Sequence, residues 1–200
     1  FRQNQVKARY YGELLVPESG HYVQQVKNGG REVEALVLDD IAAEVIENME
    51  PDVLYIVAPG STTAAVMGQL GLNNTLLGVD VVKGRAVVAS DVSGAQLESL
   101  VAAHEGKVVI ILTAIGGQGH IIGRGNQQIS PAIIRRAGAE NLTVIATKTK
   151  ILELEGRPLL VDSNDPELDR ELSGYLQVIT GYRDTILYPL GQDQKPGGVV

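Results

Sequence analysis

Apolar residues fall into short continuous runs along this chain, and the runs alternate with segments of helical periodicity. In residues 32–49, four apolar side chains recur at close to a 3.6-residue spacing with acidic residues between them, which predicts an amphipathic helix. The run at 107–115 is mainly β-branched and aliphatic and gives the strongest strand signal. We expect further strands at residues 8–16, 53–58, 75–82, 86–89, 142–146, 159–161, 175–180 and 185–190. Further helices are expected at residues 62–70, 95–104, 131–137, 148–155 and 166–172.

Buried strands that alternate with helices predict an α/β fold. The mostly parallel sheet carries helices on both faces, in a Rossmann-like three-layer arrangement, with additional N-terminal and C-terminal strands. Residues 18–31 are polar and hold three glycines. We therefore expect residues 1–31 to form an N-terminal strand and a flexible connection, and residues 32–200 to form the α/β domain.

Composition and charge narrow the possible partners. Aromatic residues make up only 4% of the chain, so small and β-branched side chains must fill the core, which favours helices packed on a sheet. The net charge of −7 makes a nucleic-acid partner improbable, although backbone N–H groups can still bind a small phosphate ligand. The sequence contains no Cys, which predicts a cytoplasmic protein, and no apolar run approaches the length of a membrane span.

The first candidate site is the turn Pro59-Gly60-Ser61-Thr62-Thr63, which lies between a predicted buried strand and a predicted helix. Glycine allows a ligand to approach the backbone closely, and the three hydroxyl groups sit where free N–H groups and the helix dipole favour an anion. The carboxyl edge of a parallel sheet is also where ligands usually bind. The alternative is that these hydroxyl groups only cap the helix.

The second candidate site is a continuous glycine-rich loop at residues 116–130, which follows the strand at 107–115 and contains five glycines within ten residues. Its expected ligand-binding residues are Gly116, Gly117, Gln118, Gly119, Arg124, Gly125, Asn126 and Gln127. A guanidinium group and several amides can fork onto a phosphate or hydrogen-bond to a base edge. The pattern lacks the Gly-Lys-Ser/Thr ending of a P-loop. The alternative is a surface loop whose glycines only make turns.

A few single residues add to these two segments. Asp80 is an acid in an apolar strand, so it either accepts local hydrogen bonds or points at a ligand. We expect Asp91 to cap the helix that follows it. His120 either contacts a ligand or is a solvated loop residue, and Lys148 and Lys150 either face a phosphate or sit on a wet helix. No metal site is expected, because no two histidines have a metal-ligand spacing.

Taken in order, several segments resemble the ATP–NAD kinase-like proteins, a group also linked to the acetoin catabolism protein X. The segments that carry the resemblance are 54–57, 59–63, 75–82, 116–119, 124–131, 144–147, 156–159, 161–162, 172–175 and 178–182. The run from Gly116 to Pro131 is the most specific of them. Relatives favour Thr-Pro before a lysine where this chain has Thr147-Lys148-Thr149-Lys150, so the resemblance aligns Lys150 with the family lysine.

The resemblance implies transfer of a phosphoryl group from ATP, or polyphosphate, to the adenosine 2′-hydroxyl of NAD. NADP is the product, and Mg²⁺ assists in the full-length enzyme. The family also carries a Gly-Gly-Asp-Gly-Thr motif, whose acid serves the transfer, and this motif is absent here. We therefore expect a longer native protein, of which this chain is the C-terminal portion. We expect the chain to be inactive alone, and its catalytic residues stay unassigned.

Two other functions fit the same residues. The turn at 59–63 also resembles the phosphate loops of ribose-phosphate isomerase-like folds, which favours a sugar-phosphate enzyme or sensor. The missing acid motif is equally compatible with a non-catalytic, nucleotide-binding regulatory module. In each case the partner is a small phosphorylated molecule, and the sequence leaves open whether the chain forms a homo-oligomer.

Overall fold

The computed structural model describes residues 34–192 of the 200-residue chain. The strand predicted at 8–16 lies outside the described residues, and so does the predicted connection up to residue 31. The division of the chain into these two parts therefore stays a prediction.

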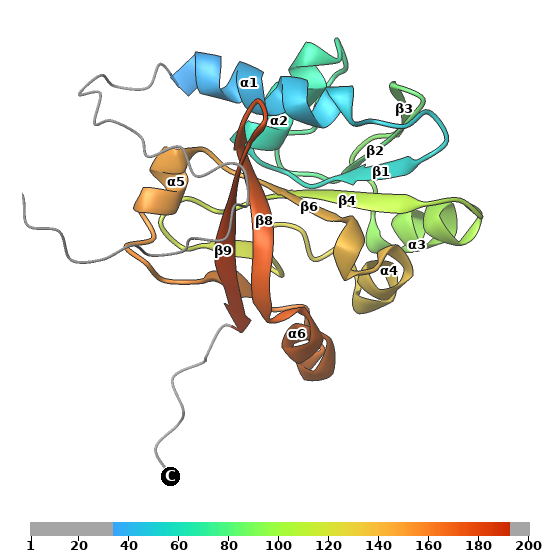
Figure 1. The fold of residues 1–200 in the computed structure, drawn as a ribbon. Coiled ribbons are helices and arrows are strands. Elements are labelled where there is room, and N and C mark those ends of the chain that lie inside the picture. The colour runs from blue at the N-terminus through green and yellow to red at the C-terminus, as the bar shows by residue number, and fades with distance from the viewer. Residues whose placement is uncertain (1–33, 193–200) are drawn as a thin grey trace, which may run out of the picture. The chain divides into compact units, whose positions relative to one another are not determined.

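The described helices and strands alternate along most of the chain, as the apolar pattern predicts (Figure 1). The helices are α1 (Glu34–Glu47), α2 (Ser61–Gln69), α3 (Gly94–Ala102), α4 (Pro131–Ala137), α5 (Lys148–Leu152) and α6 (Pro166–Leu172), with a 3₁₀ turn at Ala139–Asn141. The strands are β1 (Leu54–Val57), β2 (Asp80–Lys83), β3 (Ala86–Ala89), β4 (Val108–Thr113), β5 (His120–Ile122), β6 (Leu142–Ile145), β7 (Leu159–Val161), β8 (Gly174–Gly181) and β9 (Asp184–Gln192).

The nine strands form one sheet in the order β3-β2-β1-β4-β6-β8-β9-β7-β5. The pairs β1–β4, β4–β6, β6–β8, β7–β9 and β5–β7 are parallel. The β2–β3 hairpin at one edge and the β8–β9 hairpin add antiparallel pairs. The predicted α/β class with a mostly parallel sheet is confirmed, and so are the C-terminal strands.

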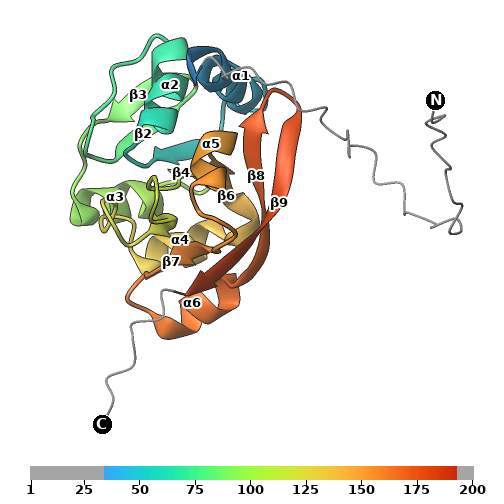
Figure 2. The same ribbon diagram turned by 90° about the vertical axis from the view of Figure 1, so that its left-hand side faces the viewer.

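Helices cover both faces of the sheet, and each face has its own apolar core (Figures 1 and 2). On one face, Ile41 of α1 and Val66 of α2 pack with Val57 and Ile111. On the other face, the side chains of α3 and α4 pack against alternate residues of β1 and β4 and against β5, β7 and β9. The apolar runs of β1 and β4 are buried along their whole length because both of their faces are covered.

The predicted strand at 75–82 is correct only in its last three residues. Regular pairing begins at Asp80, and Leu76 and Leu77 before it are exposed. The buried carboxylate of Asp80 explains the difference, because it accepts hydrogen bonds from the backbone N–H groups of Thr75 and Asp91. These two bonds wrap the chain around the acid and prevent residues 75–79 from extending.

The predicted helix cap at Asp91 is wrong. Ser93 caps α3 through a capping box with Gln96, whereas Asp91 sits in the left-handed region at φ 49°. The predicted start of α6 is correct: the side chain of Asp165 accepts hydrogen bonds from the backbone of Glu167 and Leu168.

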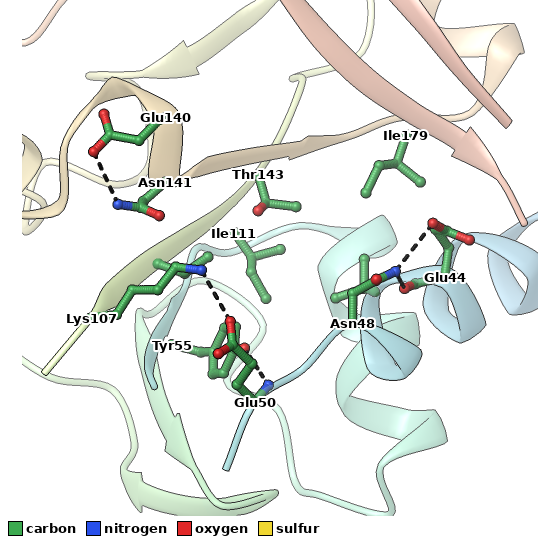
Figure 3. A pocket seen from close by; sticks show the side chains of 12 residues that line it. Glu44, Asn48, Glu50, Tyr55, Lys107, Ile111, Glu140, Asn141, Thr143 and Ile179 are labelled. Carbon is green, nitrogen blue, oxygen red and sulfur yellow. Dashed lines mark hydrogen bonds and ion pairs between the residues drawn. The ribbon is translucent and has the colours of Figure 1, made fainter. Parts of the chain in front are cut away.

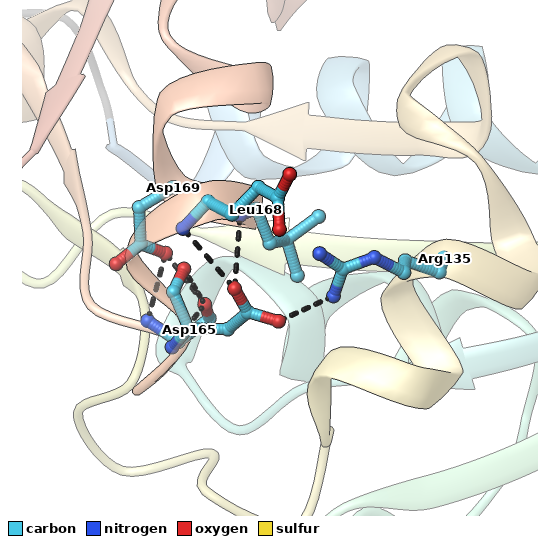
Figure 4. Close-up of polar contacts among 6 residues, drawn as sticks. Arg135, Asp165, Leu168 and Asp169 are labelled. Atoms are coloured by element: carbon cyan, nitrogen blue, oxygen red, sulfur yellow. Dashed lines mark hydrogen bonds and ion pairs between the residues drawn. The ribbon is translucent and has the colours of Figure 1, made fainter.

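Asp165 also joins α6 to α4 (Figure 4). Its second carboxylate oxygen pairs with the guanidinium group of Arg135, while Asp169 accepts two hydrogen bonds from Ser163. The hydrogen bond from Arg135, helped by the N–H group of Leu168, lowers the pKa of Asp165. The acids that follow β7 therefore organise the start of a helix.

Candidate functional site

Both predicted loops leave the sheet at the same edge. Strands β1, β4, β6 and β8 are parallel neighbours, so their carboxyl ends lie together. The turn at 59–63 follows β1, the segment that begins at Gly116 follows β4, and Thr147 follows β6. This arrangement places the segments where α/β proteins usually bind ligands.

Lys150 connects the first loop to a distant part of the chain. It lies on α5, which Thr147 caps through a hydrogen bond from the Lys150 backbone N–H. Its Nζ donates to Thr62 Oγ1 at 3.0 Å and to Ser61 Oγ at 3.3 Å. Lys150 is thus in direct contact with two other predicted site residues that lie 89 and 88 positions before it in the sequence.

The N-terminus of α2 offers donor groups at the same place. Gly60 is its N-cap, and no side chain caps the helix. The first backbone hydrogen bond of the helix runs from Ala64 N to Gly60 O, and the side chain of Thr63 also donates to Gly60 O. The N–H groups at Ser61, Thr62 and Thr63 precede that first bond, so they have no acceptor within the helix and give this end a partial positive charge.

The electrostatic setting of Lys150 favours an anion. Burial lowers the pKa of its amine, and the carboxylates of Glu34 and Glu153 oppose that shift. Among residues 34–192, no carboxylate lies within ion-pair distance of Nζ. Lys148, on the same helix, is instead paired with Asp184. A phosphate beside Lys150 would stabilise the protonated amine and compensate its partial burial.

Gly60 is required for a reason that the sequence did not reveal. Its φ is 150°, and a Cβ at this position would come within 2.3 Å of Thr113 Cγ2, so the close approach is to strand β4. Thr113 is 7% exposed, and its hydroxyl has no hydrogen-bond partner within the described residues. Sequence reasoning missed Thr113, although a hydroxyl at the end of an otherwise aliphatic strand was the available signal.

The second predicted site is divided by a strand, so the expectation of one continuous loop at 116–130 is wrong. His120, Ile121 and Ile122 form β5, which is buried and pairs with β7. Apolar residues at 121 and 122 explain the strand, since their burial extends the core. His120 is 5% exposed and is not a solvated loop residue.

The part before β5 is a tight turn beside α5. Arg157 holds it by donating from Nη2 to Gly117 O at 3.1 Å, and the carboxylate of Glu153 lies next to Gly116. Gly116, Gly117 and Gln118 are exposed. Helix α5 therefore lies against both predicted loops, through Lys150 within the helix and through its C-cap residue Glu153.

In the part after β5, the side-chain amide of Asn126 forms hydrogen bonds with the backbone of the same segment. Asn126 is 5% exposed, and it accepts from Gly123 N at 2.9 Å and donates to Ile121 O at 2.8 Å. A Cβ at Gly123 would lie 1.9 Å from the carbonyl oxygen of Asp162, so this glycine also has a packing role. Arg124, Gly125 and Gln127 are exposed, and their predicted ligand role stays a prediction.

Asp80 shows the first of its two predicted alternatives, local hydrogen bonding. It is 1% exposed, and its oxygens accept from Thr75 N at 2.7 Å and Asp91 N at 3.0 Å. These bonds account for a buried acid in an apolar strand. Any additional contact of Asp80 with a ligand stays a prediction.

A pocket of about 230 Å³ lies apart from the predicted residues, between α1 and the sheet (Figure 3). Its charged groups are largely engaged with one another: Lys107 pairs with Glu50 at 3.1 Å, and the amides of Asn48 and Asn141 donate to Glu44 and Glu140. None of the predicted site residues lines it.

The described part of the chain shows neither a cluster of metal ligands nor a helix that could span a membrane. Within it, no three His, Asp or Glu side chains gather in an arrangement that could hold a metal ion. None of the helices between residues 34 and 192 combines the length and apolar character that crossing a membrane requires.

Comparison with known proteins gives one match. The family description of the ATP-NAD kinase C-terminal domain fits residues 50–190, a stretch that includes both predicted loops and Lys150. No curated protein and no solved structure matches the chain.

Proposed function

Because the chain belongs to the family of ATP-NAD kinase C-terminal domains, we propose that it is the nucleotide-binding part of an NAD kinase-like phosphotransferase. The observation that carries the proposal is the contact of Lys150 Nζ with Ser61 and Thr62 at the start of α2. It brings an ammonium group, two hydroxyl groups and free helix N–H groups together at the ligand edge of the sheet. Each of these groups can donate a hydrogen bond to a phosphate oxygen.

In the full-length protein, the proposed reaction transfers the γ-phosphoryl group of ATP to the adenosine 2′-hydroxyl of NAD. The oxygen–phosphorus bond to ADP breaks, a bond to the 2′-oxygen forms, and the hydroxyl proton is released. Such transfers depend mainly on positioning and on stabilisation of phosphate charge. The role of this chain is to hold one phosphate group of a nucleotide through Lys150 and α2.

Mg²⁺ is the usual partner of ATP in such reactions. The described residues do not offer a carboxylate cluster for it, so we assign no step of the reaction to a metal held by this chain. The proposed work of these residues is confined to binding and orientation.

Titration calorimetry tests the proposal. The 200-residue chain is expected to bind ATP or NAD, and Lys150→Met is expected to weaken that binding by roughly tenfold or more, the scale of a charge-assisted hydrogen bond. Lys148→Met is the matched control, because Lys148 lies on the same helix but is paired with Asp184. Equal losses in the two variants would remove Lys150 from the site.

A second measurement separates binding from chemistry. The chain mixed with ATP, NAD and Mg²⁺ is expected to form no NADP, because its sequence has no Gly-Gly-Asp-Gly-Thr motif. Robust NADP formation would contradict the assignment of this chain to binding alone.

A further inference from the structure

The pocket between α1 and the sheet has an apolar floor and a size that suits one long side chain. Val45 of α1, Ile111 of β4 and Ile179 of β8 are among the apolar residues that line it (Figure 3). Its volume of about 230 Å³ is below the roughly 300–1,000 Å³ of pockets that hold drug-sized ligands. A nucleotide therefore exceeds this pocket, whereas the aliphatic stem of a single side chain fits it.

The rim of the pocket carries more negative than positive charge. Lys107 forms an ion pair with Glu50, whereas the carboxylates of Glu44 and Glu140 have no ion-pair partner among residues 34–192. The donors to these two carboxylates are side-chain amides and the backbone N–H group of Arg183, all of them neutral. The guanidinium group of Arg183 lies instead over a tyrosine ring. Two negative charges at the mouth of an apolar pocket are thus left uncompensated.

A row of apolar side chains continues from the pocket along the β8–β9 hairpin. Tyr175, Gln177 and Ile179 alternate along β8 and therefore share one face of the sheet. Leu187 of β9 is on the same face, because it pairs with Gln177. Tyr175 is 73% exposed and Leu187 is 61% exposed, whereas Ile179 lines the pocket. We call Tyr175, Ile179 and Leu187 the apolar strip; contiguous exposed apolar side chains of this kind mark interaction surfaces.

We propose that this pocket and the apolar strip form a docking surface for an extended segment of a partner polypeptide, which inserts one arginine or lysine side chain toward Glu44 and Glu140. The aliphatic stem of such a side chain covers the apolar floor, and its cation meets the rim. Every second side chain of an extended segment points to the same side, so an apolar residue two positions from the cation packs on the strip.

Charge and position decide between this partner and other occupants. The chain itself has a net charge of −7, so an acidic rim disfavours a second copy of it, and a nucleic acid even more. None of the residues that line the pocket belongs to the site at Lys150 and the start of α2. The inference is therefore independent of the proposed nucleotide function.

Two peptides that differ only in charge test the inference. The first is acetyl-Leu-Thr-Arg-Thr-Leu-amide, and the second has citrulline, a neutral group of nearly the same shape, in place of arginine. In calorimetric titrations of the full 200-residue chain, we expect the arginine peptide to bind at least about tenfold more tightly, with a preference that falls as salt is added. Agmatine, an alkylguanidinium without apolar neighbours, is expected to bind at least about tenfold more weakly than the arginine peptide.

Substitutions at exposed or half-buried positions separate the two parts of the surface. Glu140→Gln alone should reduce the preference for the arginine peptide, and its combination with Glu44→Gln should lower it to less than about threefold. Glu167→Gln, at an exposed acid of α6, is the matched control and should keep the preference. Leu187→Ser should weaken both peptides several-fold and preserve their ratio. Leu77→Ser, at a side chain that is 81% exposed and lies outside the strip, should change neither.

Each contrary result overturns the inference in its own way. Equal affinities for the two peptides would show that the rim does not select a cation. Agmatine binding as tight as that of the arginine peptide would make the pocket a site for a small molecule. A preference that survives the loss of both carboxylates would place the cation elsewhere. Self-association in sedimentation that Leu187→Ser removes would make the strip an interface between copies of this chain. Absence of peptide binding would also overturn the inference.

Discussion

The turn after β1 and the segment after β4 leave neighbouring parallel strands at one edge of the sheet. They differ in the hydrogen-bond partners of their polar groups. In the turn, Ser61 and Thr62 accept hydrogen bonds from an ammonium group that has no carboxylate partner within the described residues. In the segment after β4, Asn126 and the backbone of Gly123 satisfy each other.

The difference shows how two polar loops with the same place in a fold can have different uses. The amide of Asn126 is consumed by the loop that contains it, so it holds a conformation. The N–H groups at the start of α2 are left without acceptors in the helix. A polar residue in a loop is therefore a ligand candidate only to the extent that its local partners leave it available.

The largest expected effect is on Gly123. Gly123→Ala should lower the free energy of unfolding by about 3–5 kcal/mol or prevent folding, because the new Cβ would lie 1.9 Å from Asp162 O and the residue has φ +93°. Gly117→Ala is the matched control: its φ is +69° but nothing lies within 4 Å of the new Cβ. It should cost only about 1 kcal/mol. Urea unfolding of both variants measures the contrast, and similar costs would contradict it.

Gly60 is expected to come next. Gly60→Ala should destabilise the protein by about 2–4 kcal/mol, since φ 150° strains an alanine and the Cβ would overlap Thr113 Cγ2. Thr113→Ser removes that methyl group. In a double-mutant cycle it should recover about 1 kcal/mol of the loss, and strictly additive effects would show that the two residues do not press on each other.

Asn126→Asp tests whether the second region is held by its own amide. The substitution replaces the donor to Ile121 O with a carboxylate oxygen at nearly constant shape. We expect a loss of about 1–3 kcal/mol, the scale of a buried, unsatisfied polar group. Chemical denaturation measures the loss, and an unchanged midpoint would mean that the amide is not needed to hold the loop.

Unlike the three substitutions above, Lys150→Met should slightly increase the stability of the protein. Burial lowers the pKa of Lys150, so the folded protein holds this proton less tightly than the unfolded chain does. Burying the charged amine therefore lowers the stability of the folded protein. This loss of stability is complete at pH values where the amine is charged in both the folded and the unfolded protein. It disappears as the pH rises through the lowered pKa toward the ordinary value of about 10.4. Melting curves should show a slight gain for the variant at neutral pH that narrows at alkaline pH. A gain that widens with pH would contradict the assigned direction.

Arg124 is expected to have the smallest effect on nucleotide affinity. Arg124→Lys keeps the charge and loses the planar fork. The weakened contact with a phosphate should lower nucleotide affinity by about 1 kcal/mol. This loss should be smaller than that of Lys150→Met. Calorimetric titration of the same nucleotide into both variants compares them, and an equal or greater loss for Arg124 would move the main site to the second region.

The periodic parts of the fold could be predicted from sequence because burial dictates them. Strands β1 and β4 are covered on both faces and are aliphatic throughout, so their pattern has no other interpretation. Helix α6 begins with Asp165 as its cap and Pro166 as a first-turn residue, and both act locally. The short strand β5 was hidden among glycines, because its pairing with β7 depends on residues about 40 positions away.

The candidate site was predictable in its members but not in its contacts. The hydroxyls of Ser61 and Thr62 are visible in a strand–turn–helix pattern, and the edge of the sheet follows from the order of elements. The approach of Lys150 to those hydroxyls depends on how α5 packs, which no local pattern encodes. The same holds for Thr113, whose contact with Gly60 exists only because β1 and β4 are neighbours.

The position of β9 has a consequence for how the protein is made. This strand joins β7 to β8, and β7 in turn pairs with β5, so two strands attach to the sheet through one that is synthesised after them. The first strands can pair during translation, whereas β5 and β7 must wait for residues 184–192. A ribosome that stalls shortly before this point would hold a nascent chain with exposed apolar strands, and that stage of synthesis is where a chaperone would be needed most.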